Sequence, residues 1–109
     1  MTKMTLALPQ DPRYHASLRL FFAGLGATEE ATLEEIEDLK LLISEGMNLM
    51  TGDVTVAIAL EGGAMDATLA GTRAADEGLS RIIMESLADE VEIEEDCVRF
   101  RKVFGARHE

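Results

Sequence analysis

The sequence predicts an α+β fold, a two-layer α/β sandwich in which helices cover one face of a mixed or antiparallel sheet. Apolar residues alternate at every second position in segments bounded by turns, as in Val54, Val56, Ile58 and Leu60. Between such segments, apolar residues recur at helical spacing. The resulting order is β-α-α-β-β-α-β-β, and helices grouped between strand pairs are typical of two-layer α+β sandwiches.

The first strand and the first helix are delimited by proline and glycine. The segment "MTLALP" predicts a short strand that ends at Pro9, with Asp11 as the N-cap and Pro12 at the first position of a helix. This helix continues through "RYHASLRLFFAGLG". We expect Gly24 and Gly26 to end it, because glycine readily takes the left-handed conformation that stops helices.

A second helix and the clearest hairpin follow. Thr32 and Glu35 form a capping box at the start of "TLEEIEDLKLLISEGMNLM", which predicts a helix beginning there. The alternation in "DVTVAIALEGGAMDATLAG" predicts two strands joined by a turn at residues 61–63, Glu-Gly-Gly. This hairpin follows the second helix directly.

The end of the chain is expected to form a third helix and a second hairpin. The helix covers "EGLSRIIMESLADE", and the hairpin "VEIEEDCVRFRKVF" turns at Glu95 and Asp96. The inner face of the helix is predicted to contain Leu79, Ile82, Ile83, Ser86 and Leu87. The inward side of the hairpin is predicted to contain Val91, Ile93, Val98, Phe100 and Val103.

Composition limits the domain organisation and the function. The chain has 109 residues, of which 47% are hydrophobic and 28% charged, as expected for one globular domain over residues 1–109. Its net charge of −11 argues against nucleic acid and anionic membrane as partners and favours a basic protein. With no signal peptide, no membrane-spanning stretch and one cysteine, Cys97, we expect a soluble, cytoplasmic protein.

Glu45 and Asn48 are the first candidates for chemistry. A glutamate can act as a general base, and the amide oxygen of an asparagine can bind Mg²⁺, which prefers oxygen ligands. Their spacing of three places them on broadly the same helix face. Gly46 weakens the helix between them, however, and the helix ends soon afterwards. Taken alone, the residues favour ordinary polar side chains at a helix end.

Three segments together resemble a known family. These segments, "SLRLFFAGLGA", "LEEIEDLKLLISEGMN" and "EGLSRIIMESLADEVEIEED", are similar in order to parts of the bacterial anti-sigma factor serine kinases. That family has the histidine kinase-like ATPase (GHKL, or Bergerat) fold shared by gyrase, histidine kinases and MutL. The resemblance covers about residues 4–104. It implies the same element order that the periodicity predicts independently.

The catalytic motif of the family is only partly present. The family's second helix carries a catalytic glutamate and, four residues later, an asparagine that binds Mg²⁺. Aligning Glu45 with that glutamate puts Leu49 at the asparagine position, and aligning Asn48 puts Ser44 at the glutamate position. One residue turns a helix by about 100°. Only one of the pair therefore keeps the direction that the family requires.

The nucleotide-binding motif also departs from the family. There, an Asp-x-Gly motif recognises adenine and a long flexible lid covers ATP, whereas Gly71 and Arg73 stand at the motif positions here. Asp76 and Gly78 are the nearest residues that could bind the cofactor. The connection from Gly71 to Gly78 is too short for a lid, which would leave bound ATP largely uncovered. We expect a minimal, degenerate domain that uses neither ATP nor Mg²⁺.

The resemblance leaves a scaffold for binding proteins. Arg19 matches an arginine that helps the family to engage its partners, and Arg13 and Tyr14 lie nearby. We expect a regulatory protein-binding module resembling an anti-sigma factor, a pseudo-kinase in transcription regulation, acting alone or as a homodimer. Its partner would be a sigma factor or an anti-sigma antagonist of the STAS type. The alternative is a residual ATP-dependent serine-protein kinase with Glu45 as base and Asn48 as Mg²⁺ ligand.

Overall fold

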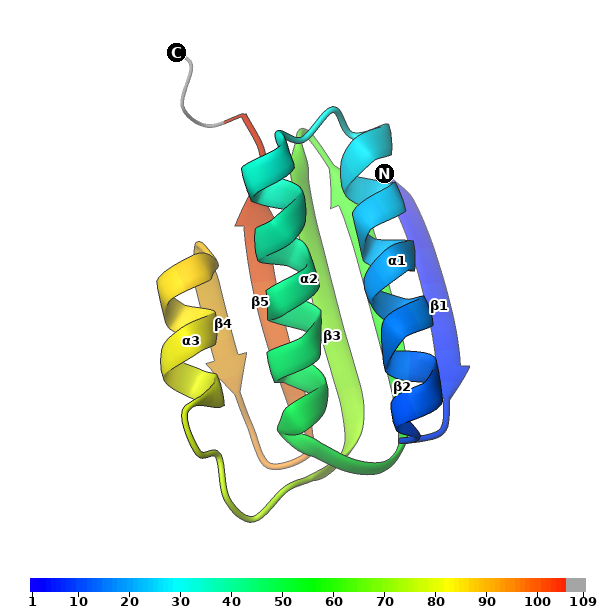
Figure 1. Cartoon of the computed structure of the whole chain (residues 1–109), viewed down its shortest axis with the longest axis vertical. Coiled ribbons are helices and arrows are strands. Elements are labelled where there is room, and N and C mark those ends of the chain that lie inside the picture. Colours follow the sequence, from blue (N-terminus) through cyan, green and yellow to red (C-terminus); the bar gives the residue numbers. More distant parts are fainter. Residues whose placement is uncertain (106–109) are drawn as a thin grey trace.

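The computed structural model describes residues 1–105, in which helices cover one face of a five-stranded antiparallel sheet (Figure 1). The elements are β1 (Thr2–Leu8), α1 (Pro12–Thr28), α2 (Leu33–Asn48), β2 (Met50–Glu61), β3 (Ala64–Arg73), α3 (Ser80–Leu87), β4 (Glu90–Ile93) and β5 (Cys97–Val103). This confirms the α+β class and the predicted element order. The sheet contains only antiparallel pairs, and the last part of the predicted domain, residues 106–109, lies outside the described residues.

The sheet order is β1-β2-β3-β5-β4, so β1 and β4 form its two edges. β2 and β3 form the predicted hairpin, and Gly62 and Gly63 make its turn with φ of 59° and 77°. Both values lie in the left-handed region, which glycine enters without steric cost. None of the helices described within residues 1–105 combines the length and apolarity needed to cross a membrane.

Helix α1 starts at the predicted cap but passes the predicted stop. The side chain of Asp11 accepts a hydrogen bond from the Arg13 N–H at the N-terminus. The helix continues through Gly24 and Gly26 to Thr28, so the prediction that these glycines end it is wrong. The left-handed residue comes later, at Glu30, with φ of 62°.

The two glycines of α1 have different surroundings. A Cβ atom on Gly26 would lie 3.0 Å from Leu39 Cδ1 and 3.2 Å from Ile36 Cγ1, so Gly26 allows α1 to approach α2 closely. A Cβ atom on Gly24 would meet no atom within 4 Å. Gly26 is therefore explained by helix packing rather than by helix termination.

Helix α2 lies at the centre of the helical layer, between α1 and α3 (Figure 1). Its capping box is formed as predicted, with the Glu35 N–H donating to Thr32 Oγ1 and the Thr32 N–H to Glu35 Oε1. Its buried residues face the sheet and both neighbouring helices. They are Leu39, Leu42, Ile43, Gly46 and Met47. Helix α2 is therefore covered on more than one side.

Helix α3 is shorter than predicted and turns a different face inward. Its buried residues are Ser80 and Met84, whereas Leu79 is 69% exposed and Ile82 63% exposed. Ser86 is also exposed, whereas Leu87 packs against the core as predicted, so the predicted inner face is wrong at Leu79, Ile82 and Ser86. The reason is that an eight-residue helix packs along a narrow line against α2, and Met84 occupies that line.

The second hairpin turns at the predicted place, but its last inward residue differs. Val98 and Phe100 are buried, and alternation along a strand then directs Lys102, not Val103, toward the helices. Lys102 Nζ lies 3.2 Å from Asp38 Oδ2 and donates to the Leu87 carbonyl at 2.8 Å. A lysine serves here because its aliphatic stem packs inside while its ammonium group reaches these oxygens.

Candidate functional site

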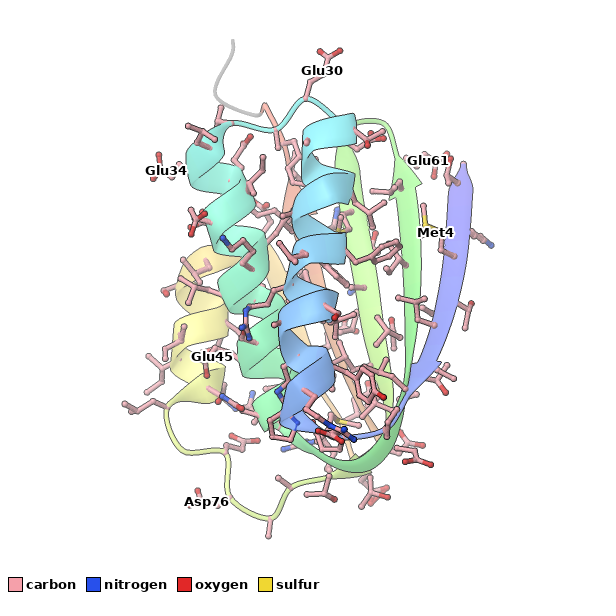
Figure 2. All side chains as sticks on the ribbon, turned by 45° about the vertical axis from the view of Figure 1, so that its right-hand side comes forward. Met4, Glu30, Glu34, Glu45, Glu61 and Asp76 are labelled. Carbon is pink, nitrogen blue, oxygen red and sulfur yellow. The ribbon has the colours of Figure 1, made fainter. Side chains whose placement is uncertain are left out.

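The candidate residues of α2 and of the β3–α3 connection lie at one end of the molecule. α2 ends there, and the chain passes from β3 to α3 through residues 74–79 (Figure 1). Figure 2 shows Glu45 on α2 and Asp76 on the loop at the same end. The structure therefore brings the two sequence segments together.

Glu45 and Asn48 contact each other, and Glu45 also contacts α3. Asn48 Nδ2 lies 3.5 Å from Glu45 Oε1, which agrees with the predicted common face. The same oxygen accepts a hydrogen bond from the hydroxyl of Ser80 at 2.7 Å. Glu45 is half-buried, Asn48 is exposed and Ser80 is 7% exposed. The carboxylate thus links α2 to the start of α3.

Ser80 is a site residue that the sequence analysis missed as a partner of Glu45. It is the one buried polar or charged residue among residues 1–105, and its hydroxyl finds its acceptor on another helix. A buried hydroxyl without an acceptor is costly, so this bond stabilises the α2–α3 contact. The only signal in the sequence was the position of a serine within an apolar helix face.

The end of β3 depends on Gly71, which stands where the resembled family has its aspartate. Its φ is 155°, and a Cβ atom there would lie 2.7 Å from the Asp53 carbonyl oxygen. β2 has a register shift between Thr51 and Val54 at this level. Any side chain at position 71 would collide with that backbone, so the glycine is required by the bulge.

Arg73 fills the space below the end of α2. Its Nε donates to the Leu49 carbonyl at 3.2 Å, and one terminal nitrogen donates to the Glu94 carbonyl at 2.7 Å. The other terminal nitrogen lies 3.1 Å from Glu77 Oε2. Carbonyls at a helix C-terminus lack intrahelical donors and attract cations. Arg73, at the end of β3, provides such a cation for the Leu49 carbonyl at the C-terminus of α2.

Glu77 connects Arg73 to α3. Its carboxylate accepts hydrogen bonds from Arg81 at 2.8 and 3.0 Å as well as from Arg73. The hydrogen bond from Arg81, followed by the bond from Arg73, holds the pKa of Glu77 below its usual value, against the opposing effect of burial. The two arginines and the glutamate therefore form one ionic network across the β3–α3 connection.

Asp76 and Gly78, the candidate cofactor ligands, bond to each other. The Gly78 N–H donates to Asp76 Oδ1 at 2.9 Å, and Gly78 has φ of 55°. Both residues are exposed. An aspartate that accepts from the backbone two residues later forms an Asx turn, which shapes the loop before α3.

The candidate partner residues on α1 do not share one face. Arg13 pairs with Asp11 at 2.8 Å, and its guanidinium carbon lies 5.6 Å from the centroid of the Tyr14 ring. Arg19 instead points toward α2, where its NH1 atom lies 3.5 Å from Ser44 Oγ. Arg13 and Tyr14 therefore contact each other near the start of α1, whereas Arg19 lies on the side of α1 that faces α2.

Within residues 1–105, no group of three or more histidine, cysteine, aspartate or glutamate side chains is arranged to hold a metal ion. Cys97, at the start of β5, is half-buried. Burial, and then the nearby Glu94 and Asp96, raise the pKa of its thiol. The protonated form of the thiol is favoured as a result.

Comparison with known proteins identifies no family. The chain matches no protein-family model, and no characterised protein matches it significantly. Fold and site together define an α+β protein with a one-sided helical layer and a hydrogen-bonded polar cluster at the α2–α3 end.

Proposed function

We propose that this protein is a regulatory protein-binding module that acts through contact with a partner and without nucleotide chemistry. The partner would be a sigma factor or an anti-sigma antagonist of the STAS type, as the resemblance to anti-sigma factor kinases implies. The observation that carries the proposal is the hydrogen bond from Ser80 to Glu45. This bond engages the carboxylate of Glu45, which a kinase of the resembled family would need as its general base.

The surroundings of Glu45 support the same conclusion. Arg73, with 14% of its side chain exposed, lies between the end of α2 and the loop that leads to α3. The ionic network of Glu77 closes that loop onto α3. The polar groups at this end therefore bond to one another and stabilise the packing of α2, β3 and α3.

One property of the surface, its charge, favours a protein partner. The net charge of −11 would steer a basic partner toward this protein and accelerate association.

Isothermal titration against purified sigma factors and STAS-type antagonists tests the proposal. We expect binding to one of these classes, with an affinity that falls as salt rises. Arg19→Ala should weaken this binding about tenfold, whereas Lys40→Ala, with the same charge change on α2, should leave it within twofold. A protein that binds neither class would refute the proposed partners.

The alternative, a residual serine-protein kinase, rests on the proximity of Glu45 and Asn48. Titration with Mg-ATP separates the two functions. We expect no binding tighter than about 1 mM, a value that corresponds to roughly 4 kcal/mol. Tighter binding that is lost in Asn48→Ala, with Ser86→Ala as an exposed control, would favour the kinase.

A further inference from the structure

The two edges of the sheet differ in length and in charge. β4 has four residues and carries Glu90 and Glu92, whereas β1 has seven residues and carries Lys3 but no acidic residue. Short, charged edge strands are protected against pairing with another chain. β1 is longer and carries a single charge, at Lys3 near its start, so the backbone groups farther along its outer edge are open to an added strand (Figure 1).

An apolar groove lies between β1 and α1. Its volume is about 250 Å³, and it is lined by Leu6, Ala7, Leu8, Tyr14, Ser17, Leu18 and Phe21. Tyr14 is 43% exposed and Phe21 36% exposed, so both rings present apolar surface to the groove. The small side chain of Ser17, which lies between them on α1, leaves the groove open.

A strand added to β1 would use the groove and the outer face together. Successive side chains of a strand point to opposite faces, so every second one would point toward the helical layer, beside α1. The others would lie on the outer face, where β1 exposes Lys3 and Thr5. Lys3 makes no ion pair with any of residues 1–105, and a cross-strand acidic side chain would complement it.

We propose that β1 binds an extended segment of a partner protein as a sixth strand of the sheet. Apolar side chains at alternate positions of the segment occupy the groove, and an acidic side chain between them lies beside Lys3. Backbone hydrogen bonds supply affinity in this mode, and the pockets for alternate side chains supply specificity. The inference rests on the proposed function only in taking the protein to bind another protein.

A second copy of the chain fits this edge less well. β1 contains no acidic residue, so two copies paired through β1 would leave Lys3 of each copy without an opposite charge. The pairing would also bring together two chains of net charge −11 each. Charge complementarity therefore favours a foreign segment that contains an acidic residue.

Selection from a phage-displayed library of random linear nonapeptides on the full-length protein tests the proposal. We expect enriched sequences with apolar residues at alternate positions and aspartate or glutamate between them. Fluorescence anisotropy of a labelled consensus peptide then measures binding. Failure to enrich any sequence, or enrichment of one without this alternation, would overturn the inference.

Two variants locate the bound peptide. Ser17→Arg places a long side chain in the groove and should weaken binding at least tenfold, whereas Ala16→Arg, about 100° around the same helix, should keep it within twofold. Lys3→Glu should weaken binding up to about fivefold and, in a new selection, replace the acidic residue with a basic one. Circular dichroism establishes that the variants are folded. Unchanged binding in Ser17→Arg, or an unchanged acidic preference in Lys3→Glu, would overturn the inference.

Analytical ultracentrifugation decides between a partner segment and a second copy. A dimer that dissociates in Ser17→Arg and persists in Ala16→Arg would assign the edge to self-association and overturn the inference. Peptide binding at β1 by a protein that binds neither sigma factors nor STAS-type antagonists would leave the inference intact and refute the proposed function. The two failures are therefore distinguishable.

Discussion

The two glycines of α1 provide a direct test of the helix packing. Gly24→Ala and Gly26→Ala make the same chemical change two residues apart in one helix. Both gain roughly 0.5–1 kcal/mol of intrinsic helix stability, because alanine loses less backbone entropy on folding than glycine. The two substitutions differ only in what the new methyl group meets.

Packing separates the two outcomes. The methyl group at position 24 would meet nothing within 4 Å, so Gly24→Ala should raise the free energy of unfolding by about 0.5–1 kcal/mol. The methyl group at position 26 would lie 3.0 Å from Leu39 Cδ1, on a side chain with no exposed surface. Overpacking costs about 1–3 kcal/mol. Gly24→Ala should therefore be more stable than Gly26→Ala by about 1–3 kcal/mol.

Urea denaturation followed by circular dichroism measures this difference. With the m-values usual for small proteins, the two midpoints should differ by on the order of 1 M. The comparison requires equal m-values in the two variants. If Gly26→Ala were as stable as Gly24→Ala, the close contact of α1 with α2 would be refuted. A loss of stability in Gly24→Ala would show that α1 does not continue through this position.

Three further predictions concern single side chains. Ser80→Ala should lower the free energy of unfolding by about 1–2 kcal/mol, because it removes the hydrogen bond to Glu45. If the losses in Ser80→Ala and Glu45→Gln were additive in a double-mutant cycle, the two side chains would not interact. The pKa of Glu77 is lower in the folded protein than its ordinary value of 4.5. The stability that ionised Glu77 contributes is therefore present above that pH and is lost as the pH falls through the folded pKa. The free energy of unfolding of the wild type, measured by urea denaturation, should therefore fall more on acidification below about pH 5 than that of Glu77→Gln. An equal fall in the two proteins would contradict this prediction. Because the pKa of Cys97 is raised, iodoacetamide should alkylate it more slowly at about pH 8 than it alkylates a free cysteine peptide, and an equal rate would count against the buried thiol.

Local signals predicted most of the fold. The Asp11 cap, the capping box of Thr32 and Glu35 and the Gly62–Gly63 turn depend on neighbouring residues, and the structure confirms all of them. The end of α1 could not be predicted in this way. A glycine that stops a helix and a glycine that admits a neighbouring helix look alike in sequence, and Gly26 is of the second kind.

The candidate site was predictable only in part. Spacing along α2 predicted that Glu45 and Asn48 share a face, and the structure places them in contact. The contacts of Ser80 with Glu45 and of Arg73 with the Leu49 and Glu94 carbonyls could not be assigned, because each joins residues more than twenty positions apart in the chain. The inner face of α3 was missed for a related reason: in a helix with apolar residues on several sides, α2 decides which side is buried.

The position of β1 in the sheet has a consequence for biosynthesis. Among the strands of this sheet β1 is synthesised first, yet it pairs with β2 from Thr2 opposite Leu60 to Leu8 opposite Val54. During translation it therefore has no partner strand until both α1 and α2 have been made. The β2–β3 hairpin, by contrast, closes through a local turn. Since distant pairings form more slowly than local ones, β1 is expected to be the last strand of the β1–β2–β3 group to join the sheet.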